Sequence, residues 1–573
     1  MAKTRGRTSV RPIGGFALCC GVAALLAAGC TPARYADQAD RSAYDAVHAG
    51  QVGALGASEA FEAKYAPFEA SAAKQIRVGD KTIPLDGETP AVLTLSDCLE
   101  VAFLNSRDYQ NRKEELYAAA LALANARRSW DVPLFAGELD AEASHTRIQN
   151  TGEENLAAAS LAPTLTQRFV HGGVLTLAAT LDWATDFVHG SQSNVVTSLL
   201  EANLTQPLLR GAWRGFAYEE QYRLERDFLF RVFEFARFRQ TFAADVFRRY
   251  HSVLTSKDEL ENERSNIVRL EQTFELTKVL VEGGQSARIE QDQAEQNLLD
   301  AKVRFERNVQ GYEDALDGFK LRLGLPIRVA VELNYPADLQ ALVNVGPTEV
   351  SFQEEEAIAV AFATRPDVLR QRAAARDADR DVDITADQFN PQLDVELDLS
   401  VEGTEPRQFE RLQFHRNRRF AGVTFNYALD QTDNRDAYRL AMIACDRAQR
   451  DLDEFLDNVR LEVRQAYREL VQSRRSYELQ VRNVKIATRR RELASLEQKE
   501  GQASARDVLE AEDALRRAQN GLTSAIVSYS STRVGFLATL GMIEVDEKGR
   551  IHERNEPFKF DRIERRYPYV GSR

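Results

Sequence analysis

Carboxylate side chains follow two glycine turns, and they are the groups in the sequence best placed to act through charge. Three acids and two neighbouring bases make up this set: Asp507, Glu510, Glu290, Arg506 and Arg288. The acids come six to nine positions after Gly284 or Gly501. Carboxylates repeated around a symmetry axis would repel one another and attract cations, and basic neighbours would relieve that repulsion. The alternative is a solvated helix face, or acids favoured at a helix start by the helix dipole.

Catalytic and metal-binding patterns are missing from the sequence. Its seven histidines are scattered without the spacing of metal ligands. It contains no glycine loop followed by lysine that would hold a phosphate, and no nucleophile elbow. We therefore expect no enzymatic activity and no cofactor.

The two glycine turns belong to a long internal repeat. GQSARIEQDQAEQNL begins at Gly284 and GQASARDVLEAEDAL begins at Gly501, and the two copies align without a gap at a distance of 217 positions. Glycine can adopt the left-handed backbone that ends one helix before the next begins. Each turn is therefore predicted to join an arriving helix to a returning helix.

Helical patterns of unusual length precede both turns. They cover residues 216–281 and 436–499, and sixty-odd residues at 1.5 Å each make a rod of about 100 Å. The returning helices end near Leu323 and Leu540 and carry a seven-residue apolar period with alanine in one row. A sustained heptad indicates left-handed supercoiling against a partner helix. Shorter helices are expected from Leu95, capped by Ser96, and at 352–388.

Alternating apolar and polar residues predict strands between the short and long helices of each copy. The clearest cover residues 135–144, 175–183, 393–401 and 423–429. The repeat distance is 259 positions at Val101 and Val360 but 217 at the turns, so the first copy holds 42 additional residues. We assign these to one extra hairpin around Leu161 to Trp183.

The N-terminus has the layout of a secretory signal. A basic segment from Lys3 to Arg11 leads into an apolar run that is too short to span a membrane, followed by Ala28, Gly29 and Cys30. This resembles a bacterial lipobox, in which the cysteine is lipidated and becomes the first residue; the alternative is ordinary cleavage near Ala28.

Composition limits the partners. The net charge is −13 and becomes about −17 without the basic first 30 residues, which argues against nucleic acid as a partner. The two later cysteines, Cys98 and Cys445, do not form a disulfide framework.

We expect a signal peptide (1–29), a lead-in (30–93), a first repeat (94–326), a linker (327–350), a second repeat (351–541) and a polar, loosely packed C-terminal tail (542–573).

Rods of this length cannot bury their surface in one compact domain, and the alternating strands suit a barrel with lipid outside and water inside. Few strands per chain require several chains, usually with cyclic symmetry. The order of these elements, with QPLLRG, LRLGLP and ATLGM at the repeat ends, resembles the outer membrane efflux protein family, of which TolC is the best-known member. The lipobox resembles its lipoprotein branch.

The resemblance implies a mostly α-helical fold with a membrane β-barrel. Tandem helix–strands–helix repeats would form a homotrimer with an outer-membrane β-barrel and an α-barrel across the periplasm. The glycine turns would lie at the periplasmic tip and meet an adaptor protein and, through it, an inner-membrane transporter. The outer-membrane lipid would surround the barrel. Four strands per chain would give a 12-stranded trimer and six would give 18.

The implied function is a passive exit duct for a tripartite efflux or type I secretion system. Asp507, Glu510 and Glu290 would form the gate, with Arg506 and Arg288 as partners, and the second copy would contribute more than the first. The residues expected to dock the adaptor are Gly284, Gln285, Gly501 and Gln502. The alternative is a periplasmic coiled-coil structural or adaptor lipoprotein without a pore, which the paired amphipathic strands disfavour.

Three further features have simple interpretations. The phenylalanine stripe between Phe228 and Phe247 is expected to pack against other helices rather than bind a ligand. The basic segment 407–419 would be an outer-surface loop, and Trp183 would lie at a membrane interface.

Overall fold

A computed structural model describes most of the chain. The described residues are 32–55, 61–63, 75–78, 81–84, 90–131, 133–148, 152–188, 191–346, 353–403, 414, 417–500, 502–546 and 549–553. The signal region, Cys30, Gly501 and most of the basic segment 407–419 lie outside them. In the described residues, no helix combines the length and the apolar character needed to cross a membrane.

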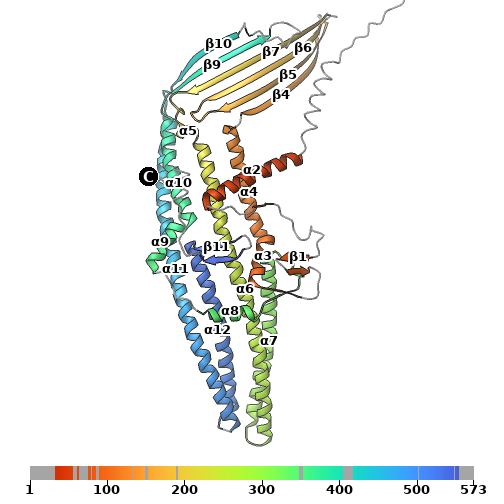
Figure 1. Ribbon diagram of the computed structural model, residues 1–573, viewed down its shortest axis with the longest axis vertical. Helices are drawn as coiled ribbons and strands as arrows, with labels where there is room; N and C mark the ends of the chain where they lie inside the picture. Colours follow the sequence, from red (N-terminus) through yellow and green to blue (C-terminus); the bar gives the residue numbers. More distant parts are fainter. Residues whose placement is uncertain are drawn as a thin grey trace, which may run out of the picture.

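Two long helical hairpins extend side by side from one sheet (Figure 1). The first consists of α6 (Glu219–Glu282) and α7 (Arg288–Leu323), and the second of α11 (Thr432–Lys499) and α12 (Ala505–Leu540). The helices α6 and α12 pack against each other and join the hairpins. The predicted long and returning helices are thus confirmed, and both turns lie at the end farthest from the sheet (Figure 1).

The predicted heptad rows pack within the second hairpin. Ala487 on α11 packs with Leu515 and Ala518 on α12, and Ala494 packs with Val508 and Ala511 nearer the turn. Alanine allows the two backbones to approach closely. The phenylalanine stripe is also core, since Phe228, Phe233, Phe235 and Phe242 are all buried.

The shorter helices are each broken once. The first repeat has α3 (Leu95–Asn105) and α4 (Arg107–Asp131), separated by extended Ser106. The second has α9 (Glu354–Thr364) and α10 (Pro366–Asp387), separated by extended Arg365. Proline disfavours helical backbone at the preceding residue, which explains the second break.

The cap of the first helix differs from the sequence prediction. Thr94, not Ser96, caps α3: its Oγ1 accepts a hydrogen bond from the Asp97 backbone, and the Asp97 carboxylate accepts one from the Thr94 backbone. This reciprocal pair satisfies two backbone donors at once, so it fixes the N-cap at Thr94, two residues before Ser96, and the helix starts at Leu95.

Six antiparallel strands form the sheet above the helices (Figure 1). They are β4 (Leu134–Ile148), β5 (Gly152–Arg168), β6 (Val174–Val188), β7 (Ser191–Pro207), β9 (Gln392–Gly403) and β10 (Asn417–Asn426). Their order is β10-β9-β7-β6-β5-β4. The predicted extra hairpin is therefore confirmed as β5 and β6, and both strands pair within the sheet.

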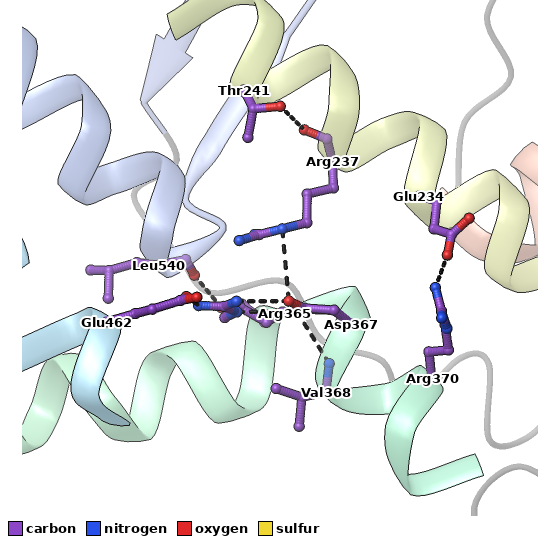
Figure 2. A network of polar contacts seen from close by, with 10 residues as sticks. Glu234, Arg237, Thr241, Arg365, Asp367, Val368, Arg370, Glu462 and Leu540 are labelled. Atoms are coloured by element: carbon purple, nitrogen blue, oxygen red, sulfur yellow. Dashed lines mark hydrogen bonds and ion pairs between the residues drawn. The ribbon is translucent and has the colours of Figure 1, made fainter. Parts of the chain in front are cut away.

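An ion-pair network around the buried Arg365 connects the second repeat to the first through Asp367 and Arg237 (Figure 2). Arg365 is 3% exposed and forms ion pairs of 2.7 Å with Asp367 and 2.6 Å with Glu462 of α11. Arg237 of α6 extends toward the same Asp367 carboxylate, with Nε 3.9 Å from Oδ2. Burial raises the pKa of Asp367, but the hydrogen bond from Arg365 and the charges of Arg237 and Arg365 outweigh it and lower the pKa overall. The carboxylate thus stays ionised and holds α10 against both long helices.

Smaller elements lie beside the long helices, and one of them lies next to the sheet, just before α6 begins (Figure 1). They are α2 (Pro32–Leu55), β1 (Gln75–Val78), β2 (Lys81–Pro84), β3 (Ala91–Leu93), α5 (Arg214–Ala217), β8 (Val331–Leu333) and α8 (Ala337–Val345). β3 and β8 pair in parallel, so the lead-in and the linker meet in one small sheet.

The C-terminal tail differs from the expectation of loose packing. Its first residues form a hairpin of β11 (Ile543–Val545) and β12 (Ile551–Glu553), and Ile543 is fully buried. Arg239 donates a hydrogen bond of 3.0 Å to the Val545 carbonyl, which ties the hairpin to α6. The prediction was wrong here because the apolar residues are too few to show a period, and contact with α6 decides their burial.

Candidate functional site at the tip of the helices

The first glycine turn closes α6 through its backbone. Gly284 has a positive φ of 71°, and the Gln285 nitrogen donates a hydrogen bond of 2.8 Å to the Leu280 carbonyl. A Cβ at Gly284 would meet no atom within 4 Å. The glycine is therefore required by its backbone conformation and not by lack of space, as the sequence predicts.

The expected docking residues are exposed at this end. Gly284, Gln285 and Gln502 are all exposed to solvent, and the Gln502 nitrogen donates a hydrogen bond of 2.8 Å to the Glu497 carbonyl. Gly501 lies outside the described residues. The exposed turns are accessible to another protein.

Asp507 caps the helix that leaves the second turn. Its carboxylate accepts hydrogen bonds from the Ser504 hydroxyl, at 2.7 Å, and from the Ser504 backbone, at 3.0 Å. The Ser504 hydroxyl in turn accepts one from the Asp507 backbone at 3.3 Å. The two bonds from Ser504 lower the pKa of Asp507. Within one chain, Asp507 thus serves as a helix-start acid, which is the alternative that the sequence leaves open.

Glu290 lies between the two hairpins. Its Oε2 accepts a hydrogen bond of 2.6 Å from the Ser286 hydroxyl and one of 3.5 Å from the backbone nitrogen of Ala505, the first residue of α12. The carboxylate therefore stands at the positive end of the α12 dipole. Of the three predicted acids, the one from the first repeat is the one that connects the hairpins.

The predicted arginine partners are not brought to these acids. Glu510 pairs instead with Arg490 of α11, at 3.6 Å between two exposed side chains. Among the described residues, Arg506 and Arg288 are exposed and form no ion pair. Asp507 bonds to Ser504 rather than to the adjacent Arg506, because the capping geometry favours its own helix start.

A buried carboxylate that the sequence analysis missed connects three helices above the tip. Glu512 of α12 is 3% exposed and accepts hydrogen bonds from Arg269 of α6 at 2.5 Å and from Arg491 of α11 at 2.8 Å. Its position is visible in the sequence, since it lies four residues after Val508 and three before Leu515 on the same helical stripe. An acid on an apolar stripe is a candidate for a buried ion pair, and the packing of α6 against α12 buries this one.

Glu263 of α6 is a second buried carboxylate that contacts arginines of two other helices, and it lies farther from the tip than Glu512. It is 1% exposed and lies 3.2 Å from Arg304 of α7 and 3.6 Å from Arg516 of α12. Beyond it, the Asn262 amide donates to Asn520 at 2.9 Å, and the Thr523 hydroxyl donates to Asp258 at 2.6 Å. Together these contacts form a polar ladder between α6 and α12. We call it the inter-hairpin ladder; its residues are Asp258, Asn262, Glu263, Arg269, Glu512, Arg516, Asn520 and Thr523.

Comparison with known proteins gives the class of this architecture. Residues 357–541 match the model of the family described as outer membrane efflux protein. No curated protein sequence matches the chain significantly. Three solved outer-membrane proteins share its fold at low sequence identity, two of them described as channels: CmeC of Campylobacter jejuni, VceC of Vibrio cholerae and MtrE of Neisseria gonorrhoeae, the last in an open state.

The agreement extends over most of each chain. CmeC is 16% identical with a TM-score of 0.56, covering 83% of this chain and 89% of its own. VceC is 13% identical with a TM-score of 0.56, over 78% and 96%. MtrE is 14% identical with a TM-score of 0.56, over 82% and 97%.

The fold is therefore that of the TolC-like outer-membrane channels. Within that class, the match in the second repeat confirms the resemblance to the outer membrane efflux protein family that the sequence predicts. The matched family is described as outer membrane efflux protein, and all three structures are described as outer-membrane proteins.

Proposed function

We propose that this chain is one protomer of a trimeric exit channel in the outer membrane, a passive duct for a tripartite efflux or type I secretion system. The observation that carries the proposal is the joining of one alternating sheet to two parallel hairpins in a single chain. This arrangement is shared with solved outer-membrane channels over about four fifths of the chain. An adaptor or structural lipoprotein would not need the six-stranded sheet.

Three copies would place the sheets in the membrane and the hairpins in the periplasm. The long helices have 64 and 68 residues and so reach about 100 Å from the sheet. Apolar side chains left exposed on single helices, such as Leu299 and Val303 on α7 and Leu479 and Leu493 on α11, would be covered by neighbouring copies.

The tip would act as the gate. Asp507, Glu510 and Glu290 would line a narrow entrance, and Arg506 and Arg288 would reach acids of a neighbouring copy. Opening would move the second hairpin away from the first, which requires the Glu290 contact and the lowest steps of the inter-hairpin ladder to break. A buried polar contact that is lost to water on opening favours a discrete closed state.

The exposed turns would dock a periplasmic adaptor, which would connect the duct to an inner-membrane transporter. Gly284, Gln285, Gly501 and Gln502 are the residues we assign to this contact. A rigid turn with an exposed backbone offers hydrogen-bonding groups at little entropic cost to the partner.

Lipidation at Cys30 would anchor each copy to the outer membrane. Mass spectrometry of the mature protein should find an acylated N-terminal Cys30, and Cys30→Ser should abolish the modification. An unmodified N-terminus close to Ala28 would refute the anchor without affecting the channel.

Native mass spectrometry of protein extracted from outer membranes tests the assembly. Three copies are expected. A stable monomer that forms no pore in lipid would contradict the proposal and favour the structural lipoprotein.

A further inference from the structure

The first repeat holds two strands more than the second. Each repeat supplies one strand after its short helix, β4 or β9, and one before its long helix, β7 or β10. The hairpin of β5 and β6 is inserted between β4 and β7 and pairs with both. We propose that this hairpin is part of the membrane wall, so that three copies close an 18-stranded barrel with an acidic water side. The inference rests on the proposed trimeric duct.

The pairing is continuous across the inserted strands. β4 pairs with β5 from Leu134 to Ile148, and β6 pairs with β7 from Val174 to Val188. Leu161 of β5 lies directly opposite both Leu139 of β4 and Leu181 of β6. If the hairpin folded inside the barrel as a plug, β5 could not pair with β4 and β6 could not pair with β7.

The two edge strands have compatible directions. In the described residues, β4 pairs only with β5, and β10 pairs only with β9. Because the six strands alternate in direction, β4 and β10 run oppositely. The β4 edge of one copy can therefore pair antiparallel with the β10 edge of the next, which closes a ring and leaves no exposed edge.

One face of the sheet is apolar across the five strands from β4 to β9 and mixed on the edge strand β10. Directly opposed residues share a face, and one such row contains Phe135, Leu165, Leu177, Ala202 and Leu399, with Arg419 as its member on β10. Farther along β10 the same face carries Ala421, Val423 and Phe425. The next row contains Leu139, Leu161 and Leu181. The inserted strands thus carry the same apolar band as their neighbours, as expected for strands in contact with lipid.

The opposite face is strongly acidic. Among the described side chains it carries nine carboxylates: Glu138, Asp140, Glu142, Asp182, Glu201, Asp394, Glu396, Asp398 and Glu402. Its two arginines are Arg168 and Arg418. The inserted strand β6 contributes Asp182, in one row with Ser160 and Asp140. Such a face belongs in water, and a wall of carboxylates favours cations.

The consequence is a wide outer opening. Barrel diameter grows roughly linearly with strand number, so 18 strands make a barrel about 1.5 times as wide as 12. Barrels of 16–18 strands enclose an aqueous channel. The narrowest part of the duct would then lie in the helical section, and the membrane section would admit bulky hydrated or cationic solutes.

Single-particle imaging of the full-length protein in lipid nanodiscs tests the strand count. Eighteen strands in the wall of the trimer are expected. A trimer with a 12-stranded wall, and the β5–β6 hairpin outside it, would overturn the inference while leaving the proposed function intact. A monomer without a pore would overturn both.

Tryptophan fluorescence gives a second test that requires no deletion. In a background with Trp130→Phe, Trp183→Phe and Trp213→Phe, Leu161→Trp should be quenched at least twofold by brominated lipids. The adjacent Ala162→Trp, on the opposite face, is the matched control and should not be quenched. Equal quenching of the two variants, or none, would show that β5 does not face lipid.

Polymer exclusion measures the width. Polyethylene glycols added on the outer side should enter the wild-type barrel up to a size about 1.5 times that admitted by a variant lacking residues 152–188. This deletion leaves residues 149–151 and 189–190 as the loop between β4 and β7. If the variant conducts and excludes the same polymers as the wild type, the hairpin does not widen the wall; if it fails to assemble, the imaging and quenching results decide.

Discussion

Arg269 of α6 donates a hydrogen bond of 2.5 Å from Nε to Oε2 of Glu512, and this buried contact lies where the two hairpins meet. The other oxygen of Glu512 accepts from Arg491 of α11 at 2.8 Å. One carboxylate thereby links three long helices. Any movement of the second hairpin away from the first must expose it or break these bonds.

Glu512→Gln should therefore loosen the tip. Removing one partner of a buried ion pair costs about 3–5 kcal/mol, and the partial exposure of Arg269 and Arg491 reduces this to about 1–3 kcal/mol. Glu271→Gln is the control, because its pair with Lys302 is exposed, lies outside the proposed gate and contributes about 0–1 kcal/mol. We expect Glu512→Gln to raise the open probability in bilayer recordings and to lower the midpoint of denaturation. If the two variants have the same open probability and the same midpoint of denaturation, the inter-hairpin ladder does not contribute to gating.

Asp507 should make the start of α12 sensitive to acid. Its pKa in the folded chain is below the ordinary value of 3.8, so its stabilisation is complete above about pH 4 and is lost as the pH falls through the folded pKa. Hydrogen exchange at the α12 start should be faster in Asp507→Asn than in the wild type at pH 7, and the difference should disappear at low pH. Between pH 5 and pH 8, Asp507 should cause no pH dependence of conductance; a transition that Asp507→Asn abolishes in that window would contradict this assignment.

Gly284 should tolerate alanine poorly although space is available. Its left-handed backbone costs a non-glycine residue about 1–2 kcal/mol. Gly311 of α7 is helical and equally open, so Gly311→Ala should instead stabilise by about 0.5–1 kcal/mol. Urea denaturation of both variants measures the contrast. If Gly284→Ala is as stable as Gly311→Ala, the turn does not depend on the glycine backbone.

An added positive charge should destabilise the protein on the apolar face of the sheet and have little effect on the acidic face. Leu397→Arg places a cation on the apolar face of β9, between Leu204 of β7 and Ala421 of β10, and should destabilise the membrane-inserted protein by about 2–4 kcal/mol near the bilayer midplane. Ser400→Arg places the same side chain on the acidic face, opposite Glu201, and should have little effect. Refolding yields into lipid vesicles compare the two. A greater loss for Ser400→Arg would invert the face assignment.

The sequence predicts those features that depend on period and repetition. The long helices, the glycine turns and the extra hairpin all follow from patterns within one chain. The break at Ser106 was missed because it interrupts the backbone for a single residue, whereas the break at Arg365 was missed although Pro366 marks it in the sequence.

The site is less predictable than the fold, because burial of a charge depends on neighbours far away in the sequence. Glu295 and Glu512 occupy equivalent positions in the two repeats, yet Glu295 is exposed and Glu512 is buried. Only the packing of α6 against α12 distinguishes them. For the same reason, the nearest arginines in the sequence were taken as partners of the acids, whereas Asp507 bonds to Ser504 and Glu290 reaches Ala505.

Single-channel recording of the purified wild-type protein in a planar bilayer tests the central claim, that this chain builds a gated duct. The account predicts cation-selective conductance with long closed periods, and a higher open probability for Glu512→Gln. Absence of any conductance, both in the wild type and in Glu512→Gln protein shown to be folded and inserted, would contradict it.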